Sequence, residues 1–448
     1  MKDQIISQPL RPDTEYLSGW RKNALLVVLF LVSAFGQIDH ILPYILAESI
    51  KAELHLTDTQ LGLITGIAFA LIYSLTSLPL ARLSDRGASK TVLVWCILIW
   101  SGMAGLGGLA VGFTTLALSR LGVALGEAGG TPASHALIVR KIPERIRGRA
   151  IGIFSMGIPL GTMIGFGLGG WANDHIGWRA ALFAAGAIGL LIAVAVMAFS
   201  GKTMPMAQTL NKDENFWSSA KELLLKPAYL WMFVGANLIG FAAAPFYSFT
   251  APLLIRTHGL TASQVGISFG LLQGLMGILG TVIGGRSYDR SMERGNGRLL
   301  DPPALVFCIA AITTLAGLFA PVGWLAIALF VPGMLSFAFV LPYAFGAGHM
   351  LAGPGKQALS SSIMMIASGL LGPALSPVLV GLISDSATAS HVGNGLRLGM
   401  LIVPLASLLS GIACFVASGH IRTFLAQMKT PEPRVAPQLK IIEDENFK

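Results

Sequence analysis

Residues 57–90 read TDTQLGLITGIAFALIYSLTSLPLARLSDRGASK, and a similar stretch, LTASQVGISFGLLQGLMGILGTVIGGRSYDR, ends at Arg290. Aligning Thr57 with Thr261 also aligns further identical residues, among them Gln60 with Gln264, Gly62 with Gly266, Arg82 with Arg286, Asp85 with Asp289 and Arg86 with Arg290. Both copies begin with Thr-x-x-Gln, the spacing of a helix capping box. Matched charges at the end of a matched apolar run predict a chain built from two similar halves.

The composition of the chain is that of a membrane protein. Of its 448 residues, 54% are hydrophobic and only 12% are charged, whereas about 25% of the residues of a soluble domain are charged. The 53 glycines lie largely inside the apolar runs, as in membrane helices whose backbones approach closely. The three cysteines also lie in apolar runs, and their spacing predicts neither a metal site nor a disulfide framework.

Twelve apolar runs are long enough to cross a bilayer, which takes about 20 residues in a helix. They lie at residues 24–47, 60–81, 91–112, 114–139, 149–171, 179–200, 228–254, 264–285, 302–320, 323–347, 358–384 and 396–418. A polar stretch separates the first six runs from the last six. The sequence therefore predicts an all-α membrane protein with twelve transmembrane helices in two pseudo-symmetric six-helix bundles.

The same pattern predicts how the chain is divided. We expect a cytoplasmic N-terminal segment (1–23), an N-terminal bundle (24–200), a cytoplasmic linker (201–226), a C-terminal bundle (227–420) and a cytoplasmic tail (421–448). The end of the tail is rich in proline and charge, a composition typical of disorder.

Basic residues are concentrated in alternate connections. One set of connections carries Arg82, Arg86, Lys90, Arg140, Lys141, Arg145, Arg147, Arg149, Arg286, Arg290, Arg294, Arg298 and the four lysines of the linker; the other set carries Lys51, Arg179, Arg256 and Arg397. Because basic loops stay in the cytoplasm, we expect a multi-pass protein of the inner (plasma) membrane with both termini cytoplasmic. Anionic lipid attracts such loops, so the net charge of +9 does not call for a nucleic-acid partner.

Several motifs resemble those of the major facilitator superfamily. The turn ARLSDRGASK (81–90) keeps the Asp-Arg pair and the final basic residue of the superfamily's loop motif, with Ala81 where glycine is usual. The second copy, GGRSYDR, keeps the Asp-Arg pair. Arg120, followed by small residues, resembles the fourth-helix motif, and GIPLGTMIGFGLGG (157–170) resembles the fifth-helix motif. The resemblance implies two parallel six-helix halves that alternate access to a central site.

Three further segments resemble the spinster-like branch of that superfamily: TDTQLGL after the first span, GEAGGTPA in the fourth, and ERIRGRAIGIFSMGIPLG entering the fifth. That branch moves sphingosine phosphates and lysophospholipids. The resemblance therefore implies a lipid-like anion as substrate. The first helix of the branch usually carries Asp-Arg, and here the pair reads Asp39-His40.

Ionisable residues inside the apolar runs are candidates for coupling transport to protons. Asp39 lies mid-way along the first run, where a charge is costly and usually functional. Burial disfavours the charged form of a carboxylate and a nearby arginine favours it, so such a group can bind and release a proton. We expect Asp39, His40 and Glu127 to take part in proton coupling. The alternative for Asp39 is a static ion pair that fixes helix packing.

Arg120 is the first candidate for contact with an anionic headgroup, because arginine binds carboxylate and phosphate in a bidentate manner. Glu127 lies seven residues further along the same helix face, so a permanent Arg120–Glu127 bridge is the alternative. We expect the substrate site to comprise Arg120, Asp39, Glu127, Tyr73, Phe337 and Tyr343.

Carboxylates in tight turns between spans are gate candidates, because they can pair with a basic group or a helix N-terminus of the other bundle in one conformation only. The expected gate residues are Asp85, Arg86, Gly62, Asp289 and Arg290. A solvated turn rich in basic residues would explain the arginines but not the two aspartates.

The sequence thus predicts a secondary active transporter that works by alternating access, coupled to protons, for an amphipathic or lipid-like anion of the lysophospholipid or sphingosine-phosphate type. The alternative within this class is a transporter or exporter of small organic acids or xenobiotics. A receptor or scaffold would gain nothing from a buried carboxylate, and a lipid enzyme would need a nucleophile–base or metal constellation. The chain contains no GxxxxGK[ST] sequence, the motif that holds the phosphates of ATP, so we do not expect direct coupling to ATP. We expect no cofactor, no catalytic residue, no nucleic-acid partner and a monomer in the lipid bilayer.

Overall fold

The computed structural model describes residues 16–201, 216–295, 298–353 and 356–429. Within these ranges the chain forms helices and the turns that join them, without a β-strand. Much of the predicted N-terminal segment, linker and tail, namely residues 1–15, 202–215 and 430–448, lies outside the described residues. The prediction of an all-α protein is confirmed.

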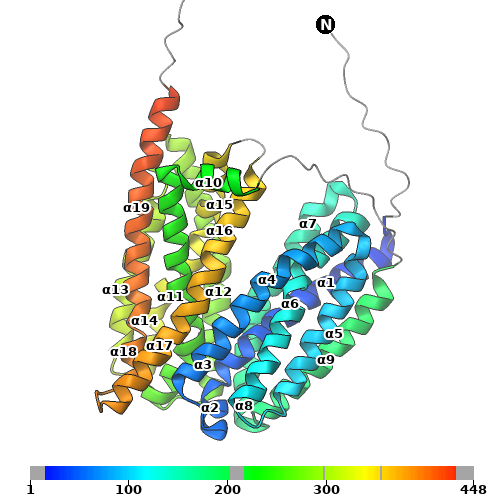
Figure 1. Cartoon of the computed structure of the whole chain (residues 1–448), viewed down its shortest axis with the longest axis vertical. Coiled ribbons are helices and arrows are strands. Elements are labelled where there is room, and N and C mark those ends of the chain that lie inside the picture. The colour runs from blue at the N-terminus through cyan, green and yellow to red at the C-terminus, as the bar shows by residue number, and fades with distance from the viewer. Residues whose placement is uncertain (1–15, 202–215, 296–297, 354–355, 430–448) are drawn as a thin grey trace, which may run out of the picture.

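The helices form two bundles (Figure 1). The first contains α1 (Gly19–Ile45), α2 (Ala47–Leu54), α3 (Asp58–Thr65), α4 (Ile67–Leu83), η1 (Ser84–Ala88), α5 (Ser89–Gly107), α6 (Phe113–Lys141), α7 (Glu144–Ser155), α8 (Gly157–His175) and α9 (Trp178–Phe199). After α10 (Phe216–Leu224), the second contains α11 (Pro227–His258), α12 (Ala262–Arg294), α13 (Asp301–Leu318), α14 (Gly323–Phe339), α15 (Leu341–Ala352), α16 (Gln357–Ile366), η2 (Ala367–Leu371), α17 (Gly372–Ala389), α18 (Gly395–Gly399) and α19 (Ile402–Lys429).

The bundles lie against each other at one end and diverge toward the other (Figure 1). We call the first the closed end; it carries α2, α3 and α18. We call the second the basic end; it carries η1, α7 and α10, and α1 begins and α19 ends there. The two most extensive interfaces between the bundles are those of α8 with α12 and of α3 with α17; α1 also contacts α11, and α4 contacts α17.

Ten helical stretches in the described residues are long and apolar enough to cross a membrane. One of them, Asp58–Gly107, contains two of the predicted runs, which are joined at η1, where Gly87 has a φ of 110°. Glycine adopts this conformation without steric cost. Helix α6 is not among the ten; it carries Arg120 and Glu127 in its interior and is less apolar. The arrangement is consistent with twelve passes.

Both predicted capping boxes are present. The Thr57 hydroxyl accepts from the backbone N–H of Gln60 at 3.1 Å, and the Gln60 side chain accepts from the backbone N–H of Thr57 at 3.0 Å. Thr261 and Gln264 make the same two bonds at the same two distances. The internal repeat of the sequence is therefore a repeat of local structure.

Glycines let the backbones of the two bundles touch. A Cβ built on Gly62 would overlap the backbone of Pro377, and a Cβ built on Gly266 would overlap the backbone of Phe166. Gly62 and Gly266 are aligned in the repeat, so both interfaces depend on a glycine at the same repeat position to let the two backbones touch. Any larger residue at these positions would push α3 from α17 or α12 from α8.

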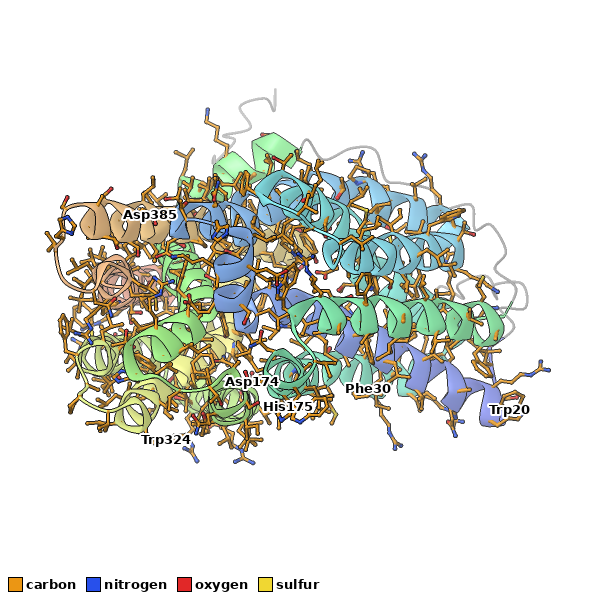
Figure 2. All side chains as sticks on the ribbon, turned by 90° about the horizontal axis from the view of Figure 1, so that it is seen from below. Trp20, Phe30, Asp174, His175, Trp324 and Asp385 are labelled. Carbon is orange, nitrogen blue, oxygen red and sulfur yellow. The ribbon has the colours of Figure 1, made fainter. Side chains whose placement is uncertain are left out.

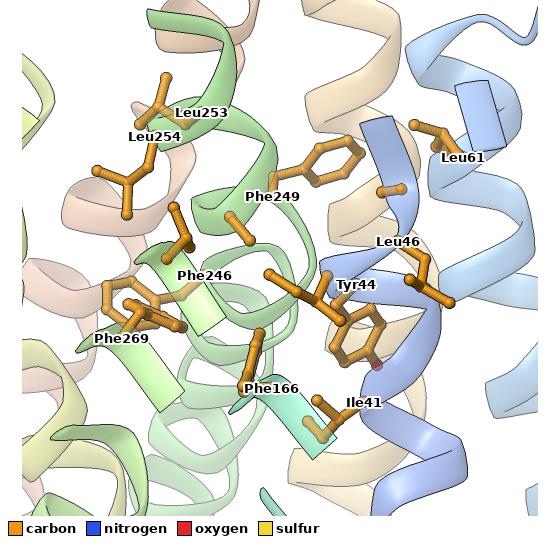
Figure 3. Packing of buried hydrophobic residues seen from close by; sticks show 14 of the residues in the cluster. Ile41, Tyr44, Leu46, Leu61, Phe166, Phe246, Phe249, Leu253, Leu254 and Phe269 are labelled. Atoms are coloured by element: carbon orange, nitrogen blue, oxygen red, sulfur yellow. The ribbon is translucent and has the colours of Figure 1, made fainter. Parts of the chain in front are cut away.

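Large apolar side chains from both bundles also pack together in one buried cluster (Figure 3). The first bundle contributes Tyr44 and Phe166, and the second contributes Phe246, Phe249 and Phe269. The rings of Phe166 and Phe269 meet edge-on with their centroids 5.3 Å apart. Packing of this kind excludes water from the closed end of the interface.

A buried carboxylate also joins the bundles at the closed end. Asp58, only 2% exposed, accepts hydrogen bonds from both terminal nitrogens of Arg256 at 2.8 and 3.0 Å, and from the Ser384 hydroxyl at 2.5 Å. Lys51 also pairs with Asp58, and Arg256 pairs with Glu48 at 2.6 Å. Because Arg256 and Ser384 belong to the second bundle, this closed-end ion cluster spans the interface.

We expect Gly266→Ala to lower the thermal stability of the detergent-purified protein, because overpacking a close contact costs about 1–3 kcal/mol. Gly277→Ala in the same helix is the matched control, since a Cβ there meets nothing within 4 Å. The control should keep or raise the unfolding temperature because alanine favours the helix. Equal effects of the two substitutions on the unfolding temperature would contradict the role of Gly266.

We expect Asp58→Asn to destabilise the protein by about 3–5 kcal/mol, because it leaves two cations without their buried partner. The control is Glu53→Gln, which removes a half-exposed carboxylate that pairs with Arg179 within the first bundle at 2.9 Å. Hydrogen bonds from Trp178 and Arg179 lower the pKa of Glu53. An unfolding temperature that falls no further in Asp58→Asn than in Glu53→Gln would refute the prediction.

Candidate functional site

Asp39 and Arg120 lie side by side in the interior of the first bundle. Asp39 on α1 is 2% exposed and Arg120 on α6 is 6% exposed. The Nη1 of Arg120 donates to the backbone oxygen of Asp39 at 3.4 Å. Both carboxylate oxygens of Asp39 and the Nε of Arg120 are buried without a hydrogen-bond partner among the described residues. The pair therefore has unused hydrogen-bonding capacity on both members.

The neighbour of Asp39 points to a different partner. The Nδ1 of His40 lies 3.7 Å from the Oε2 of Glu127 on α6, and its Nε2 lies 3.0 Å from the hydroxyl of Tyr44. His40 is 31% exposed and Glu127 is 9% exposed. Sequence reasoning did not include Tyr44, although its position four residues after His40 places the two side chains on one helix face. Glu127, His40 and Tyr44 form a continuous polar row.

The alternative of an Arg120–Glu127 bridge does not match the observed pairs. Glu127 pairs with His40, while Arg120 bonds to α1 and lies 5.6 Å from the ring centroid of Phe69. Seven residues of helix rise about 10 Å, so each side chain reaches a different neighbour. Arg120 and Glu127 lie two turns apart on α6, as their spacing predicts, but each has a different partner instead of the other.

Phe69 on α4 lies between two other rings of this site and contacts both. Its ring contacts His40, with centroids 4.6 Å apart, and stacks on Tyr73 at 5.6 Å. The structure thus brings together four predicted residues, Asp39, His40, Arg120 and Glu127, and connects Tyr73 to them through Phe69. We call this group the α1–α6 polar cluster.

The predicted residues of the second bundle separate into two places. Phe337 is 8% exposed and its ring lies 5.6 Å from Phe246 and 6.0 Å from Tyr247. Tyr343 is fully buried, and its hydroxyl donates to Ser287 on α12 at 2.8 Å. The contacts of Tyr343 lie within the second bundle, so its surroundings are those of a core residue.

The polar residue Gln273 of the second bundle had not been selected from the sequence. Gln273 on α12 is 4% exposed and its Nε2 donates to the Tyr247 hydroxyl at 2.9 Å. A glutamine inside an apolar run was the signal that could have identified this pair.

The expected gate residues lie at opposite ends of the molecule. Gly62 is at the closed end, where it contacts Pro377. Asp85 and Arg86 belong to η1 at the basic end, and Arg140 of the same bundle donates to the backbone oxygen of Asp85 at 2.6 Å. Asp289 and Arg290 lie in the last turns of α12, also toward the basic end.

The charged contacts that cross the interface were missed in the sequence. Asp58, Lys51 and Arg256 appeared there only as loop residues or as part of the repeat. Asp58 and Arg256 are separated by 198 residues, and no local pattern links them. The one available signal was an aspartate directly after the capping threonine of the first repeat copy, where the second copy has Ala262.

Known proteins resemble this chain over nearly its whole length. The model of the Major Facilitator Superfamily matches residues 25–377. An MFS-type efflux pump of Mycolicibacterium smegmatis (strain ATCC 700084 / mc(2)155) is 32% identical over 415 residues, which cover 90% of this chain and 94% of that protein.

Solved structures share the fold. A bacterial homolog of the human lysosomal transporter Spinster, inward-facing and unoccupied, has a TM-score of 0.77 and 24% identity, covering 93% of this chain and 100% of that chain. Its inward-facing, occupied form has a TM-score of 0.75, also with 24% identity, covering 92% and 98%. The nucleoside transporter NupG has a TM-score of 0.69 and 13% identity, covering 88% and 99%. The chain therefore belongs to the Major Facilitator Superfamily; it is a multi-pass membrane transporter rather than an enzyme, and it resembles the spinster-like branch.

Proposed function

We propose that this transporter is a secondary active carrier that couples the movement of an amphipathic or lipid-like anion to protons by alternating access. The observation that carries the proposal is the Asp39 carboxylate, which is buried beside the guanidinium of Arg120 and has no hydrogen-bond partner among the residues that the structure describes. An unpartnered carboxylate inside a membrane is costly. A structure that retains one gains the ability to bind and release a proton.

Asp39 is subject to two opposing effects. Burial and the negative charge of Glu127, which lies beside the adjacent His40, disfavour its charged form, and the nearby positive charge of Arg120 favours it. An anionic headgroup bound to Arg120 would weaken the stabilisation of the Asp39 carboxylate by Arg120. It would leave the effect of burial unchanged. Occupancy of Arg120 and protonation of Asp39 are therefore linked, which is the physical requirement for coupled transport. The row Glu127–His40–Tyr44 beside them supplies groups through which a proton can pass.

The arrangement of the bundles supports alternating access about this cluster. The bundles touch at the closed end and diverge toward the basic end (Figure 1). With the basic end in the cytoplasm, as the positive-inside rule requires, this arrangement is inward-facing, with both termini cytoplasmic. Both solved spinster-homolog structures with the same fold, unoccupied and occupied, are described as inward-facing.

A second substrate class is favoured by the 32% identical relative, whose name is MFS-type efflux pump. A small organic acid or xenobiotic could also occupy a site that combines Arg120 with Phe69 and Tyr73, because an aromatic acid needs one cation and one stacking surface. The polar cluster itself serves either substrate. The choice rests on how long an apolar tail the site accepts.

We expect Asp39→Asn to abolish accumulation driven by a pH gradient in proteoliposomes. The panel contains a lysophospholipid, a sphingosine phosphate and several small aromatic acids. Glu144→Gln is the control, because its carboxylate is 74% exposed at the basic end. Transport of a lipid that is lost only in Asp39→Asn supports the proposal. Transport of the small acids alone selects the second substrate class. Transport that does not depend on the pH gradient and is unchanged in Asp39→Asn excludes proton coupling through Asp39.

We expect Arg120→Lys to raise the KM for the transported anion by about tenfold while preserving the dependence on the pH gradient. Lysine keeps the positive charge beside Asp39 but loses the bidentate geometry of the guanidinium, and a good charged hydrogen bond is worth about 1.5–3 kcal/mol. Uptake rates measured over a range of substrate concentrations give the KM. An unchanged KM would remove Arg120 from the headgroup site.

A further inference from the structure

The internal repeat relates pairs of contacts at the closed end. Asp174 and Asp385 are 211 residues apart, as are Gly170 and Gly381, one helical turn before them on α8 and α17. The segments that they contact, at the starts of α12 and α3, are related by the offset of 204 residues between Thr57 and Thr261. Each contact crosses from one bundle to the other.

Asp385 on α17 binds the start of α3. Its Oδ1 accepts from the backbone N–H of Asp58 at 3.0 Å, and its Oδ2 accepts from the backbone N–H of Thr59 at 2.8 Å and from the Thr59 hydroxyl at 2.6 Å. The first N–H groups of a helix have no partner within the helix. A carboxylate of the second bundle therefore completes a helix end of the first.

Asp174 on α8 does the same in the opposite direction. Its Oδ2 accepts from the backbone N–H of Ser263 at the start of α12, at 2.8 Å. Figure 2, seen from the closed end, labels both aspartates, one on each bundle. Ser263 corresponds to Thr59 at the repeat offset of 204, so the two contacts are equivalent members of one pseudo-symmetric pair.

The glycines make these contacts possible. A Cβ on Gly381 would overlap the backbone of Asp58, and a Cβ on Gly170 would overlap the backbone of Ala262. The helix that carries each aspartate thus lies directly against the helix start that the aspartate caps. A carboxylate at a helix N-terminus is stabilised both by the hydrogen bonds and by the helix dipole.

We propose that Asp385 and Asp174 are the two latches that hold the closed end of the transporter shut, and that Asp385 is the stronger. Asp385 is half-buried, makes three bonds to α3 and adjoins the closed-end ion cluster of Asp58, whereas Asp174 is exposed and its partner helix carries Ala262 in place of Asp58. The inference goes beyond the proposed function, because it depends on neither the substrate nor the proton.

The test measures how often the closed end opens. Val265, fully buried in α12 near the interface, is replaced by cysteine in a background where Cys96, Cys308 and Cys414 are alanine. The rate at which a maleimide labels this cysteine in detergent, without substrate or gradient, reports the open population. A parallel protein that keeps only Cys96, buried inside the first bundle at 3% exposure, reports unfolding instead of opening.

We expect Asp385→Asn to raise the labelling rate of the cysteine at position 265 by roughly tenfold or more, the effect of losing charged hydrogen bonds. Asp174→Asn should raise it by roughly twofold to fivefold, the effect of a charge at an exposed helix start. The control Glu53→Gln, which removes a carboxylate at the same end whose bonds stay within the first bundle, should leave the rate unchanged.

Three results would overturn the proposal. One is an unchanged labelling rate at position 265 in Asp385→Asn. Another is an increase of the same size in Glu53→Gln, which would make the effect one of general charge. The third is faster labelling of Cys96 in parallel with position 265, which would show that the substitution unfolds the bundle. A larger effect of Asp174→Asn than of Asp385→Asn would reverse the assigned order of the latches.

Discussion

The contact of two bundles through bare backbone is the constraint on which the rest of this structure depends. Four glycines, Gly62, Gly266, Gly170 and Gly381, lie where a side chain would overlap the opposite bundle. Because these backbones touch, Asp58 can reach Arg256 across the interface. For the same reason, Asp385 can reach the start of α3 and Asp174 can reach the start of α12. The same close contact, reinforced by the apolar cluster of Phe166 and Phe269, makes one end of the molecule dry.

The sequence was informative wherever the signal was local or periodic. Capping boxes are encoded within four residues, apolar runs within about 20, and the shared face of Arg120 and Glu127 within two helical turns, and each of these was predicted. The repeat pointed to Gly62 and Gly266 as related positions. It did not indicate that both would lie at the interface, because that depends on how the two bundles meet. The same reason explains why Asp58 and Arg256 were not recognised as partners.

Side-chain partners inside the site were harder to predict than the site itself. Asp39 and His40 are adjacent, yet Arg120 bonds to the backbone of Asp39 while the His40 ring faces Glu127. Only the placement of α6 beside α1 decides between these partners. Tyr343 was selected as an aromatic residue near the end of an apolar run. Its hydroxyl instead bonds within the second bundle, since any buried tyrosine needs a polar partner and the nearest one was on α12. Composition alone does not distinguish a cavity wall from a core.

The capping boxes have a further consequence for the speed of the transport cycle. The bonds between Thr57 and Gln60, and those between Thr261 and Gln264, are made within three residues of each other, so they do not depend on the opposite bundle. When the bundles separate, the backbone N–H groups at the starts of α3 and α12 lose the acceptors on Asp385 and Asp174, and water can replace them. Forming a first helical turn anew is slow and costly compared with extending one. Helices α3 and α12 can therefore leave and regain their contacts as preformed units, and the cycle need not wait for a helix end to refold.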